Sequence, residues 1–365
     1  MIFNTIYSII ELTEIQNIDA GVKNMNVKTL YVVPTARYSI GSTQHPYSEK
    51  ETQRRILDSV LTLIGDDESF RWTCSSASVV CDYLRGADEL TRKTFFSAVE
   101  NGFVEVCGFG YDHASFMSDI TLMKSVETLD CETWKKLGIK SVMQIGVGGV
   151  NSGAVKRACE KGARYLWVGA DEVSSQMKQE VPFVFNWRVS VKDKTFTWVD
   201  SVDNDLFSLL FADKTPKFSG FDAPSAEKIL CRILQTTDKD ELVLMSARLC
   251  SKIEEIEKRS HYGAAAYPVL YTGGDGYNNA EAILSLPSFI KTWNNLGLIP
   301  RLEIATLSAA LCEVEKEITN TSLRSLTGEW SDGINQAATM PRETALLRET
   351  ERKFRAALTL PAFNA

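Results

Sequence analysis

The chain has 365 residues, of which 44% are hydrophobic and 24% are charged, a balance typical of a globular protein with a full core. Its formal net charge of −7 excludes an extended nucleic-acid surface, because phosphate binding needs clustered Lys and Arg and the sequence has no basic run. Neither a membrane span nor a signal peptide is expected, since no apolar stretch reaches about 18 residues and the apolar start of the chain lacks a basic flank.

Short β-rich runs alternate with helical patterns along the chain. In chain order the expected strands are 30–34, 70–74, 103–108, 141–145, 165–169, 267–271 and 303–306, and the expected helices between them are 49–63, one that ends at Leu84, 90–101 and 152–161. This alternation is typical of βα units around a parallel sheet. The sequence therefore predicts the α/β class, with a parallel barrel as its architecture.

The pattern changes after the last expected strand. Two helix-rich stretches, 308–317 and 341–358, lie around turns at Gly328 and Gly333. We therefore divide the chain into a barrel over residues 1–306 and a short helical appendage over residues 307–365.

Residues directly after the strand ends line the active site of a parallel barrel. That rule selects eight candidates, namely Arg37, Ser39, Asp112, His113, Gly146, Asp171, Glu172 and Asp275. Of these, Asp275 lies in a Gly-Gly-Asp-Gly turn, where a backbone bend exposes its carboxyl group. Glycoside hydrolysis uses two carboxyl groups, and Asp112, His113 or Asp171 would serve as the second acid or base. The alternatives are a hydrogen-bonding role for His113 and solvated loop charges at Asp171 and Glu172.

Aromatic side chains in or near the expected loops fit the same chemistry, because sugars stack their apolar faces on Trp and Tyr. These residues are Tyr38, Tyr111, Trp187, Tyr277 and Trp330. The alternative is that most of them are core or rim aromatics.

Metal and cofactor chemistry have little support in the sequence. A dinucleotide fingerprint would need a glycine at Asn151, so the glycine cluster that begins at Gly146 predicts a tight turn from strand to helix. An oxidoreductase on a doubly wound sheet would require this turn to bind phosphate. The three histidines are scattered, which is a poor supply of zinc ligands. The eight cysteines include no Cys-x-x-Cys pair, and we expect reduced thiols in a cytoplasmic protein. No cofactor and no metal are predicted.

Short motifs along most of the chain carry a further signal. They lie at residues 33–41, 70–72, 101–105, 162–169, 182–188, 273–275, 289–294, 328–332 and 341–346. The most specific pair is Gly-Glu-Trp-Ser-Asp at 328–332 followed by Pro-Arg-Glu-Thr-Ala-Leu at 341–346. Together they resemble the N-terminal barrel of glycoside hydrolase family 38, the α-mannosidases, and even more closely its uncharacterised relatives. The resemblance implies a (β/α)7-type barrel over 1–306, Asp275 as the catalytic acid, and a ligand cleft that includes Arg188.

The departures from the family are as informative as the matches. Family members hold a zinc-type ion with His and Asp after the first strand and use an Asp nucleophile, and these positions align with Arg37, Ser39 and Gly146. A guanidinium binds no cation and glycine carries no nucleophile, so the family's mechanism cannot run as it stands.

Two hypotheses remain open. In one, the barrel transforms a carbohydrate without metal, and Arg37 favours an anionic sugar. In the other, a non-catalytic pseudoenzyme binds a glycan or a protein partner. Family members continue into large β-rich domains, so a second copy or a partner chain is a further expectation.

Overall fold

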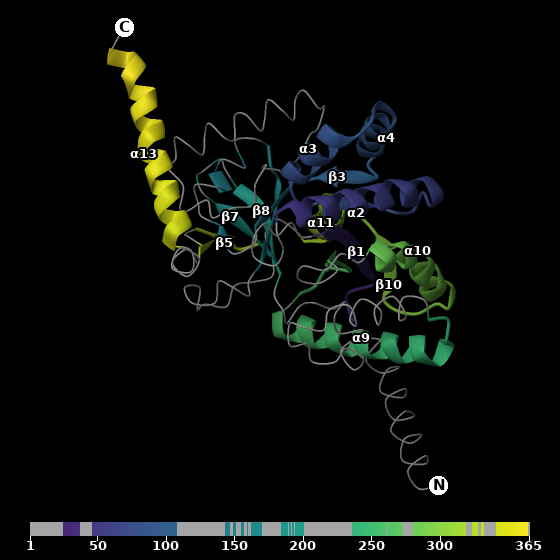
Figure 1. Cartoon of the computed structure of the whole chain (residues 1–365). Coiled ribbons are helices and arrows are strands. Elements are labelled where there is room, and N and C mark those ends of the chain that lie inside the picture. The colour runs from purple at the N-terminus through teal and green to yellow at the C-terminus, as the bar shows by residue number, and fades with distance from the viewer. Residues whose placement is uncertain are drawn as a thin grey trace. The chain divides into compact units, whose positions relative to one another are not determined.

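A computed structural model gives the structure of the protein (Figure 1). It describes residues 25–36, 46–107, 143–146, 149–150, 155–156, 159, 162–169, 184–188, 190, 192, 194–200, 236–260, 262–272, 280–318, 323–327, 330–331 and 341–363. The chain forms two compact units. The first contains Met1–Cys74, Asp82–Glu105 and Asp203–Ser322, and the second contains Ser75–Cys81, Val106–Val202 and Leu323–Ala365.

The first unit is built on a parallel sheet with β1 (Thr29–Ala36) at its centre. The other strands are β2 (Trp72–Cys74), β3 (Val104–Val106), β9 (Ala266–Thr272) and β10 (Arg301–Ile304). β1 pairs in parallel with β9, β10 and β2. Leu30 and Val32 lie on one face of the strand and Val33 lies on the other, and all three side chains are buried. A strand buried on both faces reads as a continuous apolar run, which is why the sequence predicted it correctly.

Helices flank this sheet (Figure 1). They are α2 (Pro46–Asp66), α3 (Ala77–Gly86), α4 (Glu89–Glu100), α9 (Lys239–Ser260), α10 (Ala280–Asn295) and α11 (Leu307–Glu317). α10 packs on β10 and α2, and α11 packs on β9 and β1. The parallel α/β class is therefore confirmed. α11 belongs to the first unit, and the domain boundary expected at residue 306 stays a prediction.

Local signals account for the ends of α4. Asp88 caps its start, because its Oδ1 accepts the N–H of Thr91 at 2.7 Å. After the helix, Gly102 has a φ of 73°, a conformation that glycine adopts without steric cost. These two residues explain why the bounds of this helix could be predicted to within one residue.

A buried carboxylate joins α9 to the start of β1. Glu257 accepts the N–H groups of Val27 at 2.7 Å and Asn26 at 3.0 Å. Both N–H groups lie ahead of the first strand, where no ladder partner satisfies them, so Glu257 supplies the missing acceptors.

The second unit contains a mixed sheet in the order β11 (Ser325–Leu326), β7 (Val184–Arg188), β8 (Lys194–Asp200), β6 (Tyr165–Gly169) and β4 (Met143–Gly146). β7 and β8 are antiparallel, whereas β4, β6 and β8 are parallel. The chain ends in the long helix α13 (Pro341–Phe363), yellow in Figure 1, at the place where the sequence predicted a helix.

One expectation needs correction here. The glycine cluster after β4 is not a simple turn into a helix, because β5 (Gly149–Val150) pairs antiparallel with β12 (Trp330–Ser331). The described strands form three separate sheets, and the closed barrel stays a prediction. The partner of β5 comes from far along the chain, so no local pattern indicates this pairing.

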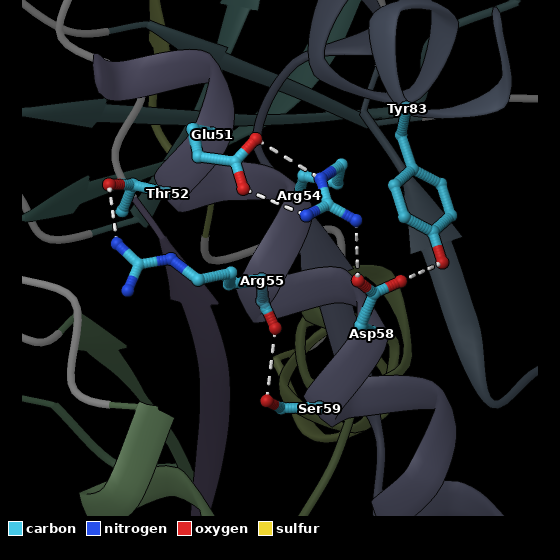
Figure 2. Close-up of polar contacts among 7 residues, drawn as sticks. All are labelled: Glu51, Thr52, Arg54, Arg55, Asp58, Ser59 and Tyr83. Atoms are coloured by element: carbon cyan, nitrogen blue, oxygen red, sulfur yellow. Dashed lines mark hydrogen bonds and ion pairs between the residues drawn. The ribbon is translucent and has the colours of Figure 1, made fainter. Parts of the chain in front are cut away.

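Polar contacts link α2 to Tyr83 of α3 (Figure 2). Arg54 binds Glu51 at 2.8 Å and Asp58 at 3.3 Å, and Asp58 accepts the Tyr83 hydroxyl at 2.8 Å. Burial and the hydrogen bond to Asp58 raise the pKa of Tyr83, so its hydroxyl stays a neutral donor. Arg54 is half-exposed, and its ion pairs lie within α2 and contribute little stability. Two polar contacts join α2 to α3, namely the hydrogen bond from Tyr83 to Asp58 and the ion pair of Lys50 with Asp82 at 2.9 Å.

Asp67, just after α2, gives the first unit a pH-dependent contact. Its carboxylate binds Lys291 of α10 at 2.7 Å and accepts two hydrogen bonds from Ser69. Burial raises the pKa of Asp67, but the hydrogen bonds from Lys291 and Ser69 outweigh this effect and lower the pKa from 3.8 to about 2. Because the pKa is depressed in the folded state, the stabilisation is complete above pH 3.8 and is lost as the pH falls towards 2.

We therefore expect Asp67→Asn to lose about 1–2 kcal/mol of unfolding free energy at pH 7, after allowance for solvent screening of the exposed Lys291. The gap from wild type should shrink when urea unfolding is repeated between pH 4 and pH 3. The neighbouring exposed Asp66 supplies the control, and Asp66→Asn should match wild type at each pH. A gap for Asp67→Asn that stays constant with pH would contradict this account.

Candidate functional site

The candidate site is the edge of the first sheet at which β1 and β9 end. The two strands are parallel neighbours, with Thr35 in register with Thr272. Arg37 follows the last residue of β1 directly, and Asp275 follows β9 after two glycines. Arg37 and Asp275 lie outside the described residues, but the chain leads to both from adjacent strand ends. Ligand sites of parallel α/β sheets lie at this edge.

Thr73 of β2 and Glu105 of β3 cap the start of α11. The N–H of Leu307 donates to Thr73 Oγ1 at 3.1 Å, and the N–H of Ser308 donates to Glu105 Oε2 at 3.0 Å. Thr306, the residue before the helix, makes no side-chain cap of its own. Two neighbouring strands thus satisfy helix N–H groups that would otherwise lack acceptors.

The titration of groups at this edge follows from their burial. Burial raises the pKa of Glu105, and the hydrogen bonds from Ser308 and Leu307 act in the opposite direction. Burial also raises the pKa of the Cys74 thiol, at the end of β2, to about 12. A thiol with that pKa stays protonated at neutral pH, so Cys74 is a core residue rather than a nucleophile.

The hydroxyl groups of Thr35 and Thr73 differ in their hydrogen bonding, although the two residues are in register on β1 and β2. Both side chains are buried, with exposed fractions of 3% and 0%. Thr73 accepts a hydrogen bond from α11, whereas Thr35 Oγ1 has no hydrogen-bond partner within the part of the chain that the structure describes. Thr35, Thr73 and Glu105 were absent from the sequence candidates, because threonine and a single acid within a strand are ordinary there.

Most of the candidates selected from the sequence lie outside the described residues. These are Arg37, Tyr38, Ser39, Tyr111, Asp112, His113, Asp171, Glu172, Asp275 and Tyr277. Gly146 is the last residue of β4, and Trp330 begins the short strand β12. For these residues a role in the site stays a prediction.

The expected loop position of Trp187 is wrong. Trp187 lies in β7, its side chain is 1% exposed, and its ring contacts Phe185 with 6.2 Å between centroids. Trp187 is therefore a core aromatic, which is the alternative that the sequence left open. Its neighbour Arg188 is exposed, and Arg188 Nη2 donates to Ser325 Oγ at 3.5 Å.

Arg37 and Ser39 lie outside the described residues, and the loss of the zinc-type ion that the family resemblance implies stays a prediction from their chemistry. Arg37 carries a cationic donor group and Ser39 a neutral hydroxyl, and neither replaces the His and Asp ligands of the family. Among the described residues, no three His, Cys, Asp or Glu side chains gather to hold a metal. No described helix has the length and apolar composition needed to cross a membrane.

Comparison with known proteins bears on the fold. No protein-family model matches the chain, and no curated protein matches its sequence. Among solved structures, the fold is similar to an α-mannosidase from Enterococcus faecalis V583, with a TM-score of 0.60 and 13% identity over 84% of this chain and 31% of that chain. The likeness shows an α/β fold similar to that of the α-mannosidase. The chain spans less than a third of that α-mannosidase.

Two further solved structures give lower TM-scores. A protein in glycosyl hydrolase family 38 from Enterococcus faecalis gives a TM-score of 0.49 and 14% identity, over 84% of this chain and 29% of that chain. The α-amylase AmyC from Thermotoga maritima gives a TM-score of 0.46 and 10% identity, over 84% of this chain and 77% of that chain.

Proposed function

We propose that this protein acts on or binds a sugar or a sugar-derived anion at the edge formed by β1 and β9, without the family's metal-dependent mechanism. The observation that carries the proposal is the parallel pairing of β1 and β9, because it supports bringing Arg37 and Asp275 to one place in a fold of the glycoside hydrolase type. A closed (β/α)7-type barrel over residues 1–306 is part of the proposal.

The roles follow from the chemistry of the two residues. The planar guanidinium of Arg37 would pair with a carboxylate or phosphate on the ligand. In the catalytic form of the proposal, Asp275 protonates the oxygen that leaves as the glycosidic bond breaks. Asp112, His113 or Asp171 removes a proton from the water that adds to the sugar carbon.

Thermal melting of the purified protein with D-mannose, D-glucuronate and D-mannose 6-phosphate, each with and without zinc, tests the proposal. A ligand at about 100 times its Kd should stabilise the protein by about 2.7 kcal/mol. We expect an anionic sugar to raise the melting temperature without zinc, and Arg37→Ala to remove that shift. Arg352→Ala, at an exposed position of α13, should keep it. No shift with any sugar, or a full shift in Arg37→Ala, would contradict the proposal.

A non-catalytic pseudoenzyme is the second candidate. It is favoured by Arg37, Ser39 and Gly146 at the positions that align with the family's metal ligands and nucleophile. Such a protein would bind a glycan, a second copy or another protein chain through the same edge of the sheet. The Asp275→Asn variant separates the two candidates, as argued in the Discussion.

A further inference from the structure

Thr35 carries a buried hydroxyl group that makes no hydrogen bond to the described residues. Its side chain is 3% exposed, and none of the described residues offers a partner to Oγ1. Burying a hydroxyl without a hydrogen bond destabilises the folded state, so such groups are rare in native proteins. Thr73, in register on the next strand, shows that a threonine at this edge can be fully satisfied by the fold.

The position of Thr35 connects it to the candidate site. It is the penultimate residue of β1, and its register partner on β9 is Thr272, the last residue of that strand. Residues in register on adjacent strands project to the same face of the sheet. Thr35 therefore shares the face of Thr73, which meets the start of the eleven-residue helix α11. Thr35 thus lies at the sheet edge where β1 and β9 end, and Arg37 and Asp275 follow these strands in the sequence.

The surroundings select the ligand group that Thr35 would meet. Glu105 lies near this face, where its Oε2 accepts the N–H of Ser308, and a carboxylate or phosphate beside it would add acceptor oxygens without a donor. A sugar hydroxyl suits the position, because it can donate to or accept from the threonine hydroxyl.

From this geometry we propose that Thr35 is a specificity-determining residue whose hydroxyl binds a hydroxyl group of the sugar ligand. The inference rests on the proposed function. A site built to bind a hydroxyl rejects analogues that lack it, because a buried polar group is then left unpaired. The Thr35 hydroxyl, which has no partner among the described residues, would thereby favour sugars that carry the matching hydroxyl group.

Two variants separate the hydroxyl from the shape of the side chain. Thr35→Val removes the hydroxyl and keeps the branched shape, whereas Thr35→Ser keeps the hydroxyl. The control is Thr62→Val on α2, where an exposed threonine hydroxyl donates to the carbonyl of Asp58 at 3.0 Å. Isothermal titration with D-mannose, D-glucuronate and D-mannose 6-phosphate gives Kd, and melting without sugar gives stability.

We expect Thr35→Val to weaken sugar binding about 3- to 10-fold, the loss of one hydrogen bond, and to melt at or above the wild-type temperature. Thr35→Ser and Thr62→Val should bind within about twofold of wild type. A purely structural role would not give weaker binding together with equal or higher stability.

Three results would overturn the inference. Wild-type affinity in Thr35→Val would show that the hydroxyl does not meet the sugar, while the proposed function stands. A melting temperature of Thr35→Val below those of both wild type and Thr62→Val would show that the hydroxyl is structural. No binding of any of the three sugars by wild type would remove the proposed function, and the inference with it.

Discussion

Trp293→Ala is expected to lower the free energy of unfolding by about 3–5 kcal/mol. Trp293 lies in α10 and is fully buried, and its ring packs on Phe289 with 5.9 Å between centroids. Its indole Nε1–H donates to the carbonyl of Pro300 at 2.9 Å. The variant would leave a cavity under α10 and a buried carbonyl without its donor, and both changes destabilise the fold.

Urea unfolding followed by far-UV circular dichroism measures this loss. Trp293→Phe keeps most of the apolar volume and removes the indole donor, so it should cost about 1–2 kcal/mol. Leu296→Ala, at a more exposed residue just after α10, should stay within about 0.5 kcal/mol of wild type. If Trp293→Ala were as stable as Leu296→Ala, this would contradict the packing of Trp293 between α10 and the sheet.

The contacts of α10 also explain the motif at residues 289–294, for which the sequence showed only a resemblance to a family. Phe289, Trp293 and Asn294 form its Phe-x-x-x-Trp-Asn pattern. Asn294 Nδ2 donates to the carbonyl of Leu302 at 2.8 Å, and Asn294 Oδ1 accepts the N–H of Leu302 at 3.1 Å. The side-chain amide thus pairs with both backbone groups of one β10 residue. The motif fixes α10 to the sheet, a structural role that needs no ligand.

Asp275→Asn is expected to lower turnover by about 10²–10⁴-fold if the protein is an enzyme, because an amide cannot donate the proton that the leaving oxygen needs. The melting temperature should stay at the wild-type value, since the change keeps the size of the side chain. Release of p-nitrophenol from a panel of neutral and anionic p-nitrophenyl glycosides gives the rates.

Asp66→Asn provides the matched control and should keep wild-type turnover, because Asp66 is an exposed residue at the end of α2. A variant with full turnover would remove Asp275 from the role of acid. Absence of turnover in wild type, together with sugar binding, would favour the pseudoenzyme over the enzyme.

The strands that lead to the candidate site were predicted from the sequence and are confirmed, whereas the roles of the site residues stay predictions. Arg37 and Asp275 were selected because a residue after a strand end is a local feature, visible without the fold. The loop position of Trp187 was wrong, because its place in the strand β7 and its burial are set by tertiary packing. Thr35 was overlooked, because the sequence does not show which buried hydroxyl lacks a partner.

By itself the sequence determined the βα alternation, the buried first strand and the helices α11 and α13, because periodicity and capping act over a few neighbouring residues. Only the tertiary structure decided that β1 lies beside β9, which follows it by more than 200 residues along the chain. The same holds for the capping of α11 by Thr73 and Glu105. Such contacts depend on the backbone pairing of distant segments, and any apolar strand offers the same backbone groups for pairing, so local sequence does not select the partner.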